Sequence, residues 1–222
     1  MDTELRAARE SHLHRWLGGN YDILQEKESD AIRLDVYVFD VEPERPYLTL
    51  VTSGMSDLPM TMPPGLERFA RAELVLNLPS PWPGLGLIRE GELPQELADD
   101  RHYWPIRLVK ELARHPHDRG NWLGMGHSIE NAGPGTGPAE PFPGTGFTGS
   151  LVGPLLTLPP GLARLDTPDG PVLYYGIFPV TPAELTLATR DPDGPRELFE
   201  LFDQRGISDV VDVGRASAVE PG

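Results

Sequence analysis

Residues 31–41, AIRLDVYVFDV, carry the most regular pattern in the chain. The segment alternates two sets of side chains, Ile32, Leu34, Val36 and Val38 on one side and Arg33, Asp35, Tyr37 and Phe39 on the other. Successive side chains of a β-strand point to opposite faces, so this alternation predicts a strand with one apolar face toward a core. Acidic side chains such as Asp35 and Asp40 are expected on the solvated face.

Further strands are predicted on the carboxyl side of this segment. Prolines interrupt residues 42–46, and two more strands follow at 47–52 and 68–78, which suggests an antiparallel meander. On the amino-terminal side, residues 3–17 have a helical composition, and a Gly-Gly pair ends that helix.

The middle of the chain combines a helix with a loop. A helix is predicted at residues 99–114. We expect it to end at His115-Pro116, because the residue before a proline is disfavoured in helical geometry. Residues 131–149 hold six glycines and four prolines, so we expect a flexible loop. Strands are predicted at 151–158 and 172–180, and the second is so apolar that a central place in the sheet is expected.

The last third begins with a clear helix signal. Thr181-Pro182-Ala183-Glu184 combines a capping threonine, a proline in the first turn and a glutamate three residues after the cap. We expect a short helix to about residue 188, a second helix at 195–205, a strand at 207–213 and a frayed tail at 216–222. Strands first and helices later predict an α+β (mixed α/β) fold.

Composition excludes several classes of protein. The 222 residues carry a formal net charge of −15, which opposes binding to nucleic acid. There is no cysteine, hence no disulfide and no thiolate metal site, in keeping with a reducing cytoplasm. No apolar run approaches the roughly 20 residues of a membrane span, so we expect no membrane partner and a cytoplasmic location.

Several side chains invite a catalytic interpretation. His115, His117 and Asp118 are possible metal ligands, as are His12 and His14, and His127-Ser128 could form a nucleophilic pair. None has the spacing that a zinc helix or a nucleophile elbow requires. We therefore expect no catalytic residue, metal or cofactor, and keep a metal-dependent or Ser/His hydrolase as the alternative. The methionines of the loop at 53–65 either pack internally or form a protein-binding surface: Met55, Met60 and Met62.

Four stretches in order resemble the suppressor of fused (SUFU) family. They are WPIRLVKELAR at 104–114, NWLGMGHSI at 121–129, YYGIFPVTPAEL at 174–185 and ISDVVDVGR at 207–215. The resemblance extends from about residue 20 to 215 and implies that residues 1–222 form one domain with its core at about 20–215. It implies a mixed, largely antiparallel sheet flanked by helices, and a domain that binds proteins without catalysis.

The resemblance also implies a type of partner and a binding region. Animal members bind a transcription factor, and bacterial single-domain members look like immunity or accessory proteins that neutralise toxins. This chain is similar to the latter, so a protein partner such as a basic toxin is expected. An aromatic and an acidic residue lie near the peptide groove of animal relatives, where this chain has His115 and Gly126. The expected partner-binding residues are His115, Trp122, Met125, Gly126 and His127.

Overall fold

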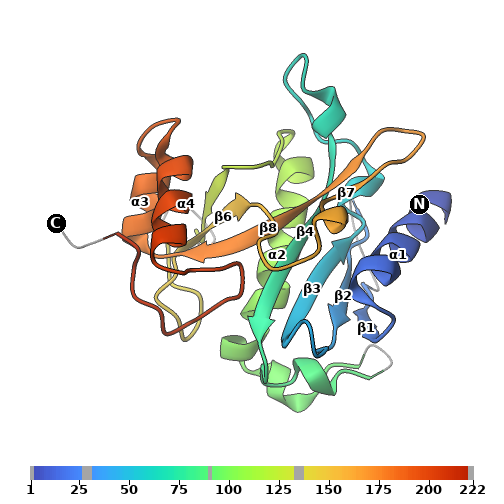
Figure 1. Ribbon diagram of the computed structural model, residues 1–222, viewed down its shortest axis with the longest axis horizontal. Helices are drawn as coiled ribbons and strands as arrows, with labels where there is room; N and C mark the ends of the chain where they lie inside the picture. Colours follow the sequence, from blue (N-terminus) through green and yellow to red (C-terminus); the bar gives the residue numbers. More distant parts are fainter. Residues whose placement is uncertain (1–2, 27–31, 90–91, 133–137, 220–222) are drawn as a thin grey trace.

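The computed structural model describes residues 3–26, 32–89, 92–132 and 138–219 (Figure 1). Its helices are α1 (Thr3–Leu17), α2 (Asp100–Arg119), α3 (Pro182–Arg190) and α4 (Gly194–Gln204). Its strands are β1 (Tyr21–Leu24), β2 (Asp35–Phe39), β3 (Tyr47–Ser53), β4 (Arg71–Pro79), β5 (Ser128–Glu130), β6 (Gly149–Gly153), β7 (Arg164–Leu165) and β8 (Val172–Val180). Within these ranges, every helix is too short or too polar to cross a membrane.

The strands form one mixed sheet in the order β1-β2-β3-β4-β8-β6-β5, with β7 paired to β8. Neighbours from β1 to β4 are antiparallel, which confirms the predicted meander and adds β1, a strand the sequence patterns did not indicate. β8 runs parallel to β4 and antiparallel to β6. The α+β class and the central position of β8 are therefore confirmed.

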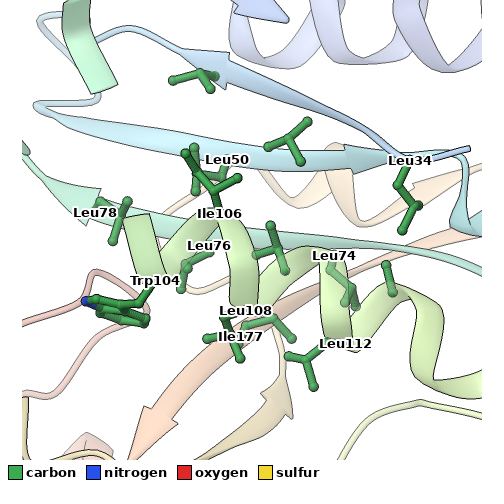
Figure 2. Close-up of a cluster of buried hydrophobic side chains, with 14 of the residues drawn as sticks. Leu34, Leu50, Leu74, Leu76, Leu78, Trp104, Ile106, Leu108, Leu112 and Ile177 are labelled. Atoms are coloured by element: carbon green, nitrogen blue, oxygen red, sulfur yellow. The ribbon is translucent and has the colours of Figure 1, made fainter. Parts of the chain in front are cut away.

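Helices cover both faces of the sheet. Val36 and Val38 face a cluster built with α2, whereas Tyr37 and Phe39 face a cluster built with α1. Figure 1 shows α1 and α2 on opposite sides of the strands, and Figure 2 shows side chains of α2 packed over β3, β4 and β8. The expectation of a solvated face on β2 is wrong, since even Asp35 is only 4% exposed.

The helix α2 is longer than predicted. It continues through Pro116 to Arg119 and ends at Gly120, whose φ of 63° is the left-handed geometry that favours glycine. A proline lacks the N–H that would bond one turn back, yet eight buried side chains of α2 pack against the core. Tertiary packing thus outweighs the local signal at His115-Pro116.

The end of the chain departs most from the sequence prediction. Residues 207–213 form no strand, and one parallel bridge joins Asn77 to Val210. The carboxylate of Asp209 accepts bonds from the backbone N–H of Leu156 and the hydroxyl of Thr157, which draws this segment away from a straight path. The strand predicted at 151–158 is also shorter, because β6 ends at Gly153 before a proline.

The tail beyond Arg215 is held against the domain at Ala218. Arg215 pairs with the buried carboxylate of Glu184, and that carboxylate also accepts the N–H of Ala218 at 2.7 Å. Ala218 is 1% exposed, so this residue is not frayed, whereas Ala216 is exposed, and 220–222 lie outside the described residues. Glu184 completes the predicted capping box of α3 with Thr181.

A second buried ion pair holds α1 on the sheet. The guanidinium of Arg9 lies 3.8 Å from the carboxylate of Glu73 on β4, and both residues are essentially unexposed. Glu73 also accepts hydrogen bonds from Thr52, from the N–H of Gly54 and from Ser56. A buried carboxylate is tolerated when its oxygens are satisfied in this way.

Replacing Glu73 tests this arrangement. Glu73→Leu removes one of the two carboxylates beside Arg9, which keeps its ion pair with Asp57 at 2.6 Å, and leaves the donors of the 52–56 segment without their acceptor. We expect the free energy of unfolding to fall by about 3 kcal/mol in urea titrations. Glu197→Gln, which breaks an exposed pair with Arg190, is the matched control and should change it by about 0.5 kcal/mol or less. Equal effects of the two substitutions would contradict the role given to Glu73.

Candidate functional site

A groove lies where the carboxyl end of α2, the edge strand β5 and the α3–α4 connection meet. It has a volume of about 1040 Å³, and we call it the β5 groove. Its walls are mainly apolar and are formed by Trp122, Met125, Ile129, Pro154, Pro192, Pro195 and Phe199. Grooves of this size with an apolar lining and a few polar groups are typical ligand sites.

The floor of the groove is built by the segment that follows α2. Leu123 is buried, and its N–H donates to the sulfur of Met60 at 3.4 Å. The N–H of His127 donates to the carbonyl of Gly124 at 3.0 Å, which closes a turn with Gly126 at a φ of 84°. This turn leaves Met125 at its tip, 52% exposed.

Two backbone hydrogen bonds attach that turn to β6. Gly126 donates to the carbonyl of Val152 at 2.9 Å, and Val152 donates to the carbonyl of His127 at 2.8 Å. Gly124 lets the indole of Trp122 approach, because a Cβ added there would lie 2.8 Å from the ring. The ring centroids of Trp122 and His127 are 4.1 Å apart. The turn is therefore held on the sheet by its backbone and on Trp122 by its histidine ring.

The opposite wall comes from α4, about 70 residues later in the chain. Phe199 packs edge-on against Phe178 of β8 at 5.2 Å between ring centroids. Gly153, at the end of β6, makes room for it, since a Cβ there would lie 2.5 Å from the Phe199 ring. Phe199 is thus fixed from below and presents its remaining surface to the groove.

The groove continues toward α2 as a smaller cavity of about 430 Å³. His115, Ser128 and Ile129 border both parts. Two buried polar atoms in these walls, Asn121 Oδ1 and Ser150 Oγ, form no hydrogen bond with any described residue. Buried polar atoms are paired in most native structures, so these two are among the exceptions in the described residues.

The electrostatics of the groove leave it close to neutral. Burial lowers the pKa of His127, although its hydrogen bond to Trp122 opposes the shift, and burial together with Arg119 lowers the pKa of His115. Both imidazoles are therefore uncharged at neutral pH. Asp191 and Arg196 are the fully charged residues among the described lining.

All five residues expected from the sequence line the β5 groove: His115, Trp122, Met125, Gly126 and His127. The other wall was not anticipated, because no local pattern links α4 to residues 121–129. One signal was present in α4. Its apolar positions 198, 199, 201 and 202 span roughly 160° of the helix circumference, more than a narrow buried stripe needs.

The candidate metal ligands do not come together among the described residues. His117 Nε2 lies 3.0 Å from the carbonyl oxygen of Met55, away from the β5 groove, and His12 Nε2 bonds in the same way to Leu162. In the described ranges, no three His, Asp or Glu side chains come together to hold a metal ion.

The loop methionines are part of the core. Met55 and Met60 are buried in the cluster beneath α2, and Met62 packs against that cluster. Their interpretation as internal packing is confirmed, and the alternative of a protein-binding surface is wrong.

Fold and groove together define an α+β domain that offers a preformed apolar cleft beside a sheet edge. The chain belongs to the suppressor of fused family, because the model of "Suppressor of fused protein (SUFU)" matches residues 30–216. No curated protein matches the chain in sequence.

Three solved structures share the fold. A SUFU homologue from Neisseria gonorrhoeae has a TM-score of 0.64 at 17% identity, over 99% of both chains. A chain of the Sufu-Fu complex has a TM-score of 0.61 at 20% identity, over 96% of this chain and 91% of that one. Drosophila Suppressor of Fused has a TM-score of 0.57 at 19% identity, with 98% of this chain and 54% of that chain covered.

The titration of His127 tests the geometry of the groove floor. Because the Trp122 ring and the groove wall bury the imidazole, its midpoint by NMR should lie below the ordinary 6.5. Trp122→Ala exposes the ring and should move the midpoint up toward 6.5. The unfolded chain takes up this proton near pH 6.5, so the contribution of neutral His127 to stability falls as the pH drops below that value. A midpoint at or above 6.5 in the unsubstituted protein would contradict this geometry.

Proposed function

We propose that this protein is a non-enzymatic binding domain that holds an extended segment of a partner protein in the β5 groove. One observation carries the proposal. An edge strand borders an apolar groove, with a buried polar atom of Asn121 unpaired in its wall and one of Ser150 unpaired in the adjoining smaller cavity. Membership of the SUFU family supports a protein-interaction role, and one similar fold comes from the Sufu-Fu complex.

The edge of β5 supplies the hydrogen-bonding part of the proposed site. β5 is the last strand in the sheet order and pairs with β6. The N–H of Val152 donates to the carbonyl of His127, and the N–H of Asn131 donates to the carbonyl of Thr148. In an antiparallel ladder the residues that bond to the neighbouring strand alternate with residues whose N–H and C=O groups point the other way. The backbone groups of Ser128 and Glu130 therefore point away from β6. A partner segment in extended conformation can pair with these groups while its side chains enter the groove.

Net charge indicates the kind of partner. At −15, the protein attracts a basic partner from a distance, while the nearly neutral groove provides the close contact. We propose a basic protein such as a toxin, which the domain binds and neutralises as an immunity or accessory protein. The absence of cysteine from the sequence supports action in the cytoplasm.

The groove is tested by a charge placed at the tip of its turn. Met125→Asp puts a carboxylate on an apolar wall, and we expect it to weaken partner binding about tenfold or more. Leu93→Asp is the matched control, since Leu93 is 54% exposed against 52% for Met125 and lies outside the groove. Affinity capture from extract of the native cell, quantified by mass spectrometry, compares the variants. A stoichiometric partner retained equally by both would refute the groove as its site.

Salt tests the proposed charge of the partner. If a basic protein is attracted by the acidic domain, the association rate constant should fall about tenfold or more between low and physiological ionic strength. The dissociation rate constant should change much less, because the groove contacts are apolar. Surface plasmon resonance with the captured partner measures both rates, and an association rate independent of salt would exclude electrostatic attraction.

A further inference from the structure

A second apolar hollow lies at the other end of α2 from the β5 groove. Its volume is about 680 Å³, and its lining includes Trp82, Leu87 and Glu96, which precede α2 in the chain. α2 has 20 residues, so about 30 Å separates its two ends. In Figure 1 the loop from β4 to α2 lies at the bottom of the view, whereas α3 and α4 lie at the upper left. We call this second site the β4-end hollow.

The floor of the β4-end hollow is rigid. Leu48 and Trp82 lie in it and are 3% and 7% exposed. The indole N–H of Trp82 donates to the carbonyl of His102 at 2.9 Å, and its ring meets Trp104 edge-on at 5.9 Å. These contacts hold the indole against the first turn of α2, so the hollow exists without a bound molecule.

Its rim carries apolar side chains that the fold leaves in solvent. Leu87 is 56% exposed and Val41 is 44% exposed, and both line the hollow together with Pro81 and Pro83. A single exposed leucine needs no explanation, but two apolar side chains around a concave apolar floor form a continuous surface of the kind that binds partners.

The charges of the hollow have one sign. Asp40 and Glu96 are its charged lining residues, and no Lys, Arg or His lines it among the described residues. Asp40 accepts a hydrogen bond from Asn20 at 3.1 Å, which fixes its carboxylate beside the hollow. The β5 groove differs in this respect, because Arg196 and two histidines line it.

We propose that the β4-end hollow docks a partner segment in which an apolar side chain is flanked by Lys or Arg. The apolar side chain enters between Trp82 and Leu87, and the basic side chains meet Asp40 and Glu96. Charge complementarity selects this occupant, since both lining carboxylates and the net charge of −15 favour a cation over an acidic or neutral segment. The site is separate from the β5 groove and adds a second contact region to the molecule.

A labelled short peptide with a central Leu-Trp-Leu between pairs of lysines is the probe, measured by fluorescence anisotropy. Asp40→Asn combined with Glu96→Gln should weaken binding about fivefold, and Leu87→Ser should weaken it further. The matched control is Asp166→Asn with Asp169→Asn, which removes the same charge from the exposed turn before β8 and should leave the affinity unchanged. Met125→Asp in the β5 groove should also leave it unchanged.

Four results would overturn the proposal. The first is that the lysine peptide does not bind. The second is that a peptide with glutamates in place of the lysines binds with the same affinity. The third is that the hollow variants and the control variant lose the same amount of peptide affinity. The fourth concerns a second copy of this chain as the occupant. If sedimentation shows a dimer that Leu87→Ser converts to a monomer, the hollow is a self-association surface. Each result is independent of the β5 groove, whose own test uses Met125→Asp.

Discussion

The pairing of β8 with both β4 and β6 is the constraint on which the rest of the structure depends. Five residues of β8 run parallel to β4, and its carboxyl half runs antiparallel to β6. A parallel pair needs a long crossover, and here the crossover includes α2, which covers one face of the sheet. α3 begins two residues after β8 ends, so the register of this strand also positions the α3–α4 wall of the β5 groove.

Two buried carboxylates attach the chain's outer segments to this sheet. Glu73 holds α1 through Arg9, and Glu184 holds the segment after α4 through Arg215. Arg215 also lies over the rings of Phe147 and Phe202, at 4.9 and 5.2 Å from their centroids, which joins the loop before β6 to α4. Hydrogen bonds to Arg215 and to backbone N–H groups keep the pKa of Glu184 low against the opposing effect of burial. Both carboxylates are thus buried and satisfied by hydrogen bonds.

Local patterns predicted the elements whose signals lie within a few residues. Alternation located β2, the apolar run located β8, and the Thr181 capping box located the start of α3. Predictions were wrong where distant contacts decide. Pro116 lies inside α2 because the helix is buried over the sheet, and residues 207–213 bend because Asp209 bonds to Thr157, about 50 residues earlier.

The candidate site was likewise predicted only in part from the sequence. The family resemblance indicated a binding region, and its residues line the β5 groove: His115, Trp122, Met125, Gly126 and His127. Residue patterns could not place Phe199 against them. By itself the sequence determined the class of fold, the net charge and the central strands, because periodicity and composition act over short spans. Only the tertiary structure decided which walls face each other and which polar atoms stay unpaired. Those properties depend on contacts between segments far apart in the chain, and local preference does not encode them.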